Sequence, residues 1–496
     1  MSQVWNDYIV LNLEYMENNK YMKKFLKYAT LILLLFVSFS FVFTGCGKDD
    51  DNDYDAPSAD ARVYGNGGLA VRKGDYLYFV NGYRTYADVT KEEKTLSNAD
   101  NVVRGAIYRT KLSATGDLTV DEDGKIVADS VERVIDKIAC FENGGLYIVG
   151  NYIYYATPNT QDDRSGNLLN KYVDYCRASL SDPSDREVLY TSDGEVTDGE
   201  WHVYGDNGNI YLVVKSAKKV VCIKNSDDAY DMITDFTTVK FWKNEDGHAL
   251  AEHEKYVYYT RAVGDNDSVT SGNVVARVKL GSSTEEVIKR DGSTNTLKDL
   301  KNGKIYYTDS DMLMRVATPT FGVVAGIGDK ALTQKSYDEM YVIENNEPSS
   351  TLNRILVVES SNNSKVLSYY DNGSWEKTTV ATANMKILEV EGNYVYYYDS
   401  DNAAIYRVDI VSKEITKLTN GSNNINFDVE KKMNFDVDVN YMYFLNGYTV
   451  ESTTQYYLER VDLTYTTPSH TFVGQFVDGE APVEEDEDTE NDDTNN

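Results

Sequence analysis

The chain has 496 residues, a formal net charge of -31 at pH 7, and 41 tyrosines against 4 tryptophans. This excess of carboxylates argues against binding to nucleic acid or to anionic lipid through a basic surface. Aromatic side chains suit the pleated, half-buried surface of a β-sheet, so the composition indicates strands.

Residues 22–45 have the layout of an export signal. Met22–Lys27 is basic, and Ala29–Gly45 is an uncharged, largely apolar run, as in the first two regions of a secretory signal. The sequence FTGC at residues 43–46 resembles a bacterial lipobox, which implies cleavage before Cys46 and a lipid on its thiol. An uncleaved anchor is the alternative, because the run approaches the ~20 residues of a membrane-spanning helix.

The segments around this signal complete the expected domain organisation. Residues 1–21 match no part of a signal, so we expect translation to start at Met22. Residues 46–64 form a lipidated cysteine and an acidic tether, and residues 479–496 form a solvated acidic tail. We therefore expect an exported protein, lipid-anchored to the bacterial cell envelope and facing away from the cytoplasm.

A repeated pattern runs through residues 65–478. Each unit contains a short segment of alternating aromatic or apolar residues, and most of these segments follow Gly or Asn. Alternation with period two after a turn residue predicts a β-strand. The segments are DYLYF (75–79), NYIYY (151–155), NIYLVV (209–214), KYVYY (255–259), KIYY (304–307), RILVV (354–358), NYVYYY (393–398) and NYMYF (440–444).

A second strand follows each segment, and in six units it carries an arginine at an equivalent position. These arginines are Arg109, Arg177, Arg277, Arg315, Arg407 and Arg460. The two widest gaps between them contain KKVVCIKN (218–225) and KVLSYYDN (365–372), which complete eight units. Units of roughly 50 residues with four short strands are typical of propeller blades. We predict an all-β propeller of eight four-stranded antiparallel blades, with strands A to D in chain order; the weaker third and sixth units leave seven blades open.

The cadence G-x-x-Y-Y, Y-R-V-D, K-L-T resembles the tyrosine-rich β-propellers of secreted bacterial lipoproteins. It is similar in style to the YWTD propellers of lipoprotein receptors and to TolB-like propellers, and it covers most of residues 65–478. The resemblance implies binding of proteins, glycans or peptides. We expect the tyrosines to pack between blades, and each repeated arginine to lie over a ring or to pair with an acidic turn.

The connection between strands B and C is longest in units eight, one, two and four. All B–C connections of a propeller emerge on one side, and loops on a rigid scaffold often carry function. We therefore predict a ligand-binding surface there, with ordinary solvated loops or tryptophans buried between blades as the alternatives. The candidate residues are Tyr83, Arg84, Tyr86, Asp162, Asp163, Arg164 and Tyr448 in these connections, with Trp201, His202 and Trp242 near the starts of strand A in units three and four.

The sequence contains no nucleophile elbow, phosphate loop or metal-binding triad, so we assign no catalytic residue, cofactor or metal. The spacing of His248 and His253 does not suit zinc ligands on one helix face. We expect Cys140, Cys176 and Cys222 to be buried thiols rather than disulfide partners. The favoured function is a monomeric binding or scaffold module for protein, peptide or glycan. A glycan-active enzyme with carboxylates near the central opening and an envelope assembly factor are the alternatives.

Overall fold

The computed structural model describes residues 56–84, 102–121, 126–127, 130–139, 145–159, 161, 163–167, 172–193, 200–265, 267, 271–287, 295–343, 353–371, 376–419, 427, 434–435, 440–464 and 470–477. The expected signal, Cys46, residues 46–55 of the tether and the acidic tail lie outside the described residues. Within the part that is described, no helix is long and apolar enough to cross a membrane.

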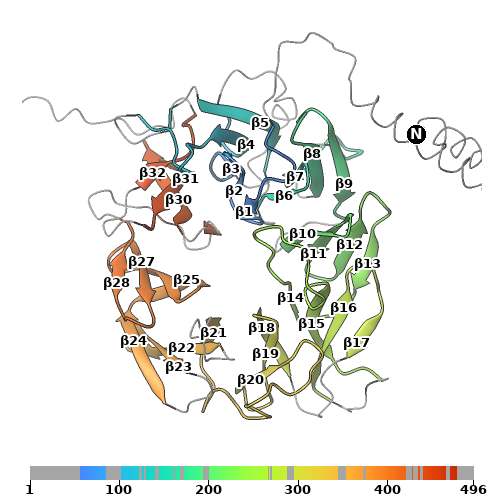
Figure 1. Cartoon of the computed structure of the whole chain (residues 1–496), viewed down its shortest axis with the longest axis vertical. Coiled ribbons are helices and arrows are strands. Elements are labelled where there is room, and N and C mark those ends of the chain that lie inside the picture. The colour runs from blue at the N-terminus through green and yellow to red at the C-terminus, as the bar shows by residue number, and fades with distance from the viewer. Residues whose placement is uncertain are drawn as a thin grey trace, which may run out of the picture. The chain divides into compact units, whose positions relative to one another are not determined.

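Eight antiparallel sheets follow one another around a closed ring, which is a β-propeller (Figure 1). The sheets succeed each other in chain order, and blade 8, red in Figure 1, lies beside blade 1, which is blue. Every described blade is built from consecutive strands, so the ring closes by packing between blades rather than by exchange of a strand. The predicted eight-bladed fold is confirmed.

The first four blades hold seventeen of the described strands. Blade 1 has β1 (Val63–Tyr64), β2 (Ala70–Lys73), β3 (Tyr76–Val80), β4 (Ala106–Lys111) and β5 (Val131–Ile138). Blade 2 has β6 (Tyr147–Val149), β7 (Tyr152–Pro158), β8 (Val173–Ser179) and β9 (Arg186–Thr191). Blade 3 has β10 (Glu200–Asp206), β11 (Asn209–Lys215), β12 (Val220–Lys224) and β13 (Tyr230–Ile233). Blade 4 has β14 (Thr238–Lys240), β15 (Tyr256–Ala262), β16 (Asn273–Lys279) and β17 (Glu285–Val287).

The other four blades complete the ring. Blade 5 has β18 (Thr296–Lys301), β19 (Lys304–Thr308) and β20 (Met314–Ala317). Blade 6 has β21 (Glu339–Ile343), β22 (Arg354–Ser361), β23 (Ser364–Tyr370) and β24 (Lys377–Ala383). Blade 7 has β25 (Met385–Glu391), β26 (Tyr394–Asp399), β27 (Ala404–Asp409) and β28 (Ile415–Lys417). Blade 8 has β29 (Asn434–Phe435), β30 (Tyr441–Val450), β31 (Thr453–Asp462) and β32 (His470–Phe472).

Two blades depart from four strands among the described residues. Blade 1 has β1 as an added strand beside its strand A, β2, and blade 5 has three strands. The third and sixth units, in which the pattern is weakest, nevertheless form complete blades with β12 and β23 as their strands C.

Strands A and B are joined by tight turns in most blades. In blade 3 the turn consists of Asn207 and Gly208, with φ angles of 49° and 79°. Such left-handed conformations are open to Asn and Gly, and they form the type I′ turn that matches the twist of a hairpin. In the blades with such a turn, the Gly or Asn before the aromatic strand therefore helps to reverse the chain.

The repeated aromatic and arginine residues form a layer inside each blade. In blade 4, Tyr258 of strand B lies opposite Arg277 of strand C, and the Arg277 guanidinium stands 4.0 Å from the centre of the Tyr256 ring. Tyr258 is fully buried. Arg277 also forms an ion pair with Glu286 of strand D at 2.6 Å. The same arginine–ring contact occurs for Arg109, Arg177, Arg407 and Arg460, over Tyr76, Tyr152, Tyr394 and Tyr441.

Four of the strand C arginines also join their blade to the next one. Arg277 donates to the carbonyl of Pro319 in blade 5 at 3.1 Å, and Arg177 donates to the Ser226 hydroxyl in blade 3 at 3.2 Å. Arg315 pairs with Asp309 of its own B–C turn at 2.5 Å, and it also donates to the carbonyl of Asp329 in the segment between β20 and β21. Longer contacts of the same kind run from Arg407 to the Leu463 carbonyl at 3.4 Å and from Arg460 to the Gly116 carbonyl at 3.5 Å.

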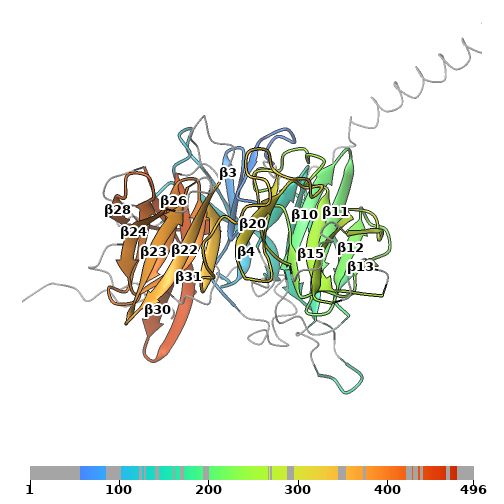
Figure 2. The same cartoon turned by 90° about the horizontal axis from the view of Figure 1, so that it is seen from below.

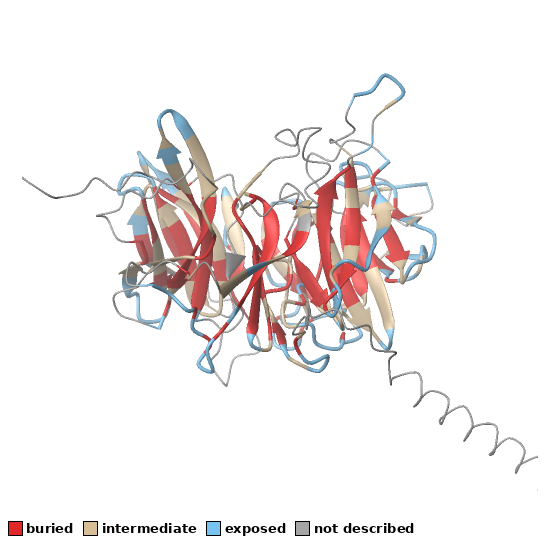
Figure 3. Cartoon of the chain, turned by 90° about the horizontal axis from the view of Figure 1, so that it is seen from above, coloured by how far each residue is buried: buried red, intermediate tan, exposed pale blue. Residues whose placement is uncertain are grey.

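The B–C connection of blade 8 corrects one expectation. The segment expected to be a long loop continues the strands, because β30 and β31 pair up to Val450 and Thr453 across a two-residue turn. This hairpin projects beyond the neighbouring blades (Figure 2), and its tip is exposed (Figure 3). A ladder of hydrogen bonds thus holds these residues in a rigid arm.

The described cysteines are buried free thiols, as expected for Cys176 and Cys222. Burial raises the pKa of Cys176 to about 12, so its thiol is protonated and unreactive near neutral pH. Cys140 lies outside the described residues.

Candidate functional site

The hairpin of blade 8, formed by β30 and β31, carries aromatic rings on both faces. On one face, Tyr448, Tyr457, Phe472 and Phe476 form a group that we call the hairpin aromatic cluster. The rings of Phe472 and Phe476 stack at 4.3 Å, and Tyr448 meets Phe476 edge-on at 4.9 Å. Tyr457 is fully buried beneath them, whereas the other three rings are half-buried. The cluster therefore offers apolar area to solvent on a rigid support.

A buried polar network fixes the base of this cluster. The Glu459 carboxylate, 5% exposed, accepts hydrogen bonds from the Tyr448 hydroxyl and from Asn446 Nδ2. It also pairs with His470 Nδ1 at 3.0 Å, and His470 Nε2 lies 3.0 Å from the carbonyl of Leu418 in blade 7. Both ring nitrogens thus face acceptors, an arrangement that requires an imidazolium.

The ionisation of this network follows from its contacts. Burial alone would raise the pKa of Glu459, but His470, Tyr448 and Asn446 outweigh that effect and hold the pKa below its usual value. Burial lowers the pKa of His470, but Glu459 and the Leu418 carbonyl raise it by more, so the pKa stands above its ordinary value. A charged pair therefore holds Tyr448 in place from below.

On the other face, the hairpin meets the start of the B–C connection of blade 1. The Tyr83 amide donates to the Tyr456 carbonyl at 2.8 Å, and both rings are half-buried against the core of blades 8 and 1. Asn81 exchanges hydrogen bonds with the backbone of Gln475, at 3.0 Å and 2.8 Å. Asn81 is 1% exposed, so these bonds close the ring at a buried position.

The predicted residues of the first two blades are placed only in part. Tyr83 and the half-buried Arg84 begin the blade 1 connection, whereas Tyr86 and Asp162 lie outside the described residues. Asp163 accepts the side-chain amide of Asn167 at 3.0 Å and the backbone amides of Asn167 and Ser165 at 2.8 Å, which lowers the pKa of its carboxyl and fixes the turn. Arg164 is exposed in that turn, so the guanidinium is offered to solvent.

The predicted tryptophans lie inside the ring. Trp201 is 2% exposed and meets the Tyr147 ring edge-on at 4.8 Å, between blades 2 and 3. Trp242 is 6% exposed and follows the end of β14 rather than preceding its start. His202 bridges Glu200, at 3.1 Å, and the Tyr147 hydroxyl, at 3.2 Å. These rings contribute to packing between blades in the structure.

Phe472 and Phe476 were not among the predicted residues. They belong to the sequence HTFVGQF, in which aromatic residues lie at the end of the last outer strand. Their position at the B–C end of strand D, beside an unusually long B–C connection, is the signal that identifies them.

A second group of polar residues lies where the inner strands face one another. Irregular pairing at Leu297/Asp299 in β18 and at Ile387/Glu389 in β25 marks a β-bulge at equivalent positions of blades 5 and 7. Bulges re-aim side chains and are frequent beside functional sites. Burial raises the pKa of Asp299, and Glu389 lies 3.5 Å from the ammonium of Lys243 in blade 4. The ring centre is therefore charged and partly accessible, since Lys243 is 58% exposed.

The chain matches no family model and no curated protein. Solved structures with a similar arrangement include a prolyl endopeptidase, with 9% identity and a TM-score of 0.41 over 82% of this chain and 55% of that one. Oligopeptidase B from Leishmania major has 12% identity and a TM-score of 0.40, over 82% of this chain and 54% of that one. An oligogalacturonate lyase in complex with manganese has 11% identity and a TM-score of 0.36, over 62% of this chain and 85% of that one. The chain thus spans little more than half of each peptidase, and likeness at these TM-scores says nothing about activity, substrate or cofactor.

Proposed function

We propose that the chain is an exported protein, anchored to the bacterial cell envelope by a lipid on Cys46, whose propeller binds a protein, peptide or glycan on its B–C side. The observation that carries the proposal is the rigid hairpin of blade 8, with half-buried aromatic rings on both faces. Aromatic rings provide stacking area for sugars and peptide side chains at a low cost in conformational entropy.

The start of the folded unit supports an orientation in which this side faces away from the membrane. Lys73, 1% exposed, donates to the carbonyls of Ala59 and Gly150, each at 3.0 Å. Gly150 belongs to the A–B turn of blade 2, so the segment after Ala56 is held on the A–B side of the ring. A tether from Cys46 would join the domain there, opposite the B–C connections.

Binding is tested by applying residues 55–496 to a glycan array and to a library of extended peptides. We expect retention of one class without turnover. Arg164→Ala should weaken it at least several-fold, because the variant removes an exposed cation on the B–C side. The matched control is Lys111→Ala, which removes a cation that is 56% exposed at the A–B end of β4. Equal effects of the two variants, or no binding to either library, would contradict the proposal.

The anchor is tested separately by growing cells with labelled palmitate. We expect label on the chain in the membrane fraction, and we expect Cys46→Ala to remove the label and release the protein. A labelled Cys46→Ala variant, or an unlabelled native chain, would contradict lipidation of Cys46. Cross-linking of the native chain to an envelope complex would instead favour an assembly factor.

A glycan-active enzyme is the second candidate function, favoured by the bulges at Asp299 and Glu389, two carboxyls that both interact with Lys243. A carboxyl with a raised pKa can act as a general acid, and a neighbouring carboxylate can act as a base. Release of reducing ends from a glycan by the native chain, and its loss in Asp299→Asn and Glu389→Gln, would support this candidate over binding alone.

A further inference from the structure

Residues 241–255 connect β14 to β15 in blade 4 and differ from the other described A–B connections. In five blades this connection is a two-residue turn. These turns are residues 74–75, 150–151, 207–208, 302–303 and 392–393. The blade 4 connection is much longer and forms no strand, and every one of its residues is described. We call it the central segment because of the contacts that it makes.

The central segment reaches three other blades. The carbonyl of Glu245 accepts the amide of Asn66 in blade 1 at 2.9 Å. The carbonyl of Trp242 accepts the Tyr204 hydroxyl of blade 3 at 2.9 Å, and Lys243 pairs with Glu389 of blade 7 at 3.5 Å. Blades 1, 3 and 7 lie on different sides of the ring (Figure 1), so a segment that contacts all three passes across the ring centre.

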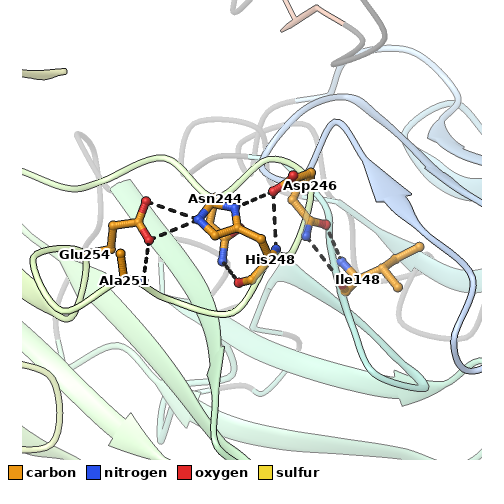
Figure 4. Close-up of polar contacts among 7 residues, drawn as sticks. Ile148, Asn244, Asp246, His248, Ala251 and Glu254 are labelled. Carbon is orange, nitrogen blue, oxygen red and sulfur yellow. Dashed lines mark hydrogen bonds and ion pairs between the residues drawn. The ribbon is translucent and has the colours of Figure 1, made fainter. Parts of the chain in front are cut away.

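One histidine holds the central segment in its folded form. His248 Nδ1 lies 2.5 Å from Asp246, and His248 Nε2 lies 3.0 Å from Glu254 (Figure 4). Glu254 also accepts the amide of Ala251 at 2.7 Å, and Asn244 donates to the His248 carbonyl at 3.0 Å. The imidazole therefore ties the two ends of the bend to each other.

This geometry requires a proton on each ring nitrogen. A carboxylate only accepts hydrogen bonds, and a neutral imidazole donates from one nitrogen alone. Loss of one proton would break one of the two bonds and turn a lone pair toward a carboxylate. Asp246 and Glu254 are the charged groups that the ring contacts, and the side chains of blade 1 next to the adjoining Gly247, Asn66 and Val63, are uncharged.

The pKa values agree with this geometry. Partial burial lowers the pKa of His248, but the bonds to Asp246 and Glu254 outweigh it and the pKa stands above its ordinary value. Burial raises the pKa of Asp246, and His248 reverses that effect, so the carboxyl remains ionised. An ordinary histidine titrates near pH 6.5, so the His248 imidazolium persists above that pH and loses its proton at a higher one.

We propose that the central segment is a proton-operated cover over the A–B side of the ring centre, closed while His248 is an imidazolium and loosened when it is neutral. The polar groups behind it, including Glu389, would then be more accessible at higher pH. This proposal is independent of binding on the B–C side.

The test is hydrogen exchange of the full chain, followed by mass spectrometry from pH 5.5 to 8.5. Protection of peptides within residues 243–255, corrected for the intrinsic exchange rate at each pH, should fall about tenfold or more as His248 loses its proton, as expected for a lost charge-assisted bond. Peptides of blade 7 within residues 394–409 should keep their protection and serve as the internal reference.

Two variants decide the role of the proton. His248→Gln should show the low protection at every pH, because glutamine cannot bond both carboxylates as a cation. His253→Gln is the matched control in the same segment, since its ring packs edge-on against Trp242 at 4.7 Å, and it should keep the native pH dependence. The proposal would be overturned if protection of residues 243–255 did not depend on pH in the native chain, or if His248→Gln kept the native pH dependence.

Discussion

Blades 4 and 7 share a core and differ in their connections. Both place a buried tyrosine of strand B opposite the strand C arginine, Tyr258 with Arg277 and Tyr396 with Arg407. Blade 7 passes from strand A to strand B in two residues, whereas blade 4 uses residues 241–255 and crosses the ring centre. The buried tyrosine–arginine core that both blades share is sufficient for the packing of one blade against the next. The part that differs is where we expect roles other than folding.

The largest expected effect is on the shared core. Tyr258→Ala and Tyr396→Ala should each lower the free energy of unfolding by about 3–5 kcal/mol, the cost of truncating a large buried side chain. The two rings are 0% and 1% exposed, so the losses should be similar. Denaturant unfolding measures them, and a loss below about 1 kcal/mol in either blade would break the equivalence of the two cores.

Substitutions of the strand C arginines should lower the free energy of unfolding by less than the tyrosine substitutions, and by different amounts in the two blades. Arg277→Met should destabilise by about 1–3 kcal/mol, because it removes a hydrogen bond to Pro319 and leaves Glu286 without its partner. Arg407→Met should cost less, since Arg407 stands 4.8 Å from its ring and reaches the Leu463 carbonyl at only 3.4 Å. Thermal unfolding compares them, and the reverse order would refute this account of the blade joints.

The pH dependence of stability should identify the charged pair beneath the hairpin. Because the pKa of His470 is raised in the folded state, its contribution is fully present below about pH 6.5 and is lost as the pH rises through the folded value. Because the pKa of Glu459 is lowered, its contribution is lost only in acid, as the pH falls through the folded value.

We therefore expect the melting temperature to decline above about pH 6.5. His470→Gln should remove the part of that decline that comes from this pair, while His253→Gln keeps it. A variant that retained the full native slope would show that the pair contributes nothing to stability.

The smallest expected effects are at the exposed cations. Arg164→Ala and Lys111→Ala should each change the free energy of unfolding by less than about 0.5 kcal/mol, as is usual for surface substitutions. Denaturant unfolding confirms that any loss of binding in Arg164→Ala comes from the removed contact. A larger stability change would make Arg164 part of the fold.

Most of the blade core was predictable because it repeats. The alternating tyrosines and the strand C arginines have a period, and the structure places Arg277 and Arg407 over tyrosine rings as expected. The central segment has no counterpart among the other A–B connections that the structure describes, and no periodicity identified it. The long B–C connection of blade 8 was found by its length, but its hairpin form depends on pairing between β30 and β31 that the repeat does not contain.

The candidate site was less predictable for a related reason. Trp201 and Trp242 are as suited to packing between blades as to a ligand, and only their neighbours in space distinguish the two roles. Tyr448 was predicted from its loop, but its support by Glu459 and His470 joins strands C and D with a carbonyl of blade 7. Contacts of that kind depend on the ring being assembled.

The most direct measurement replaces residues 448–455 with Asn-Gly, which shortens the blade 8 hairpin to the pair Gly447 and Tyr456 and removes the Tyr448 ring from the hairpin aromatic cluster. Glu459 loses the Tyr448 hydroxyl but keeps Asn446 and His470, so the free energy of unfolding should fall by only about 1–3 kcal/mol. Affinity for the glycan or peptide selected by the native domain should fall at least tenfold. Native affinity in the shortened variant would contradict recognition by the hairpin.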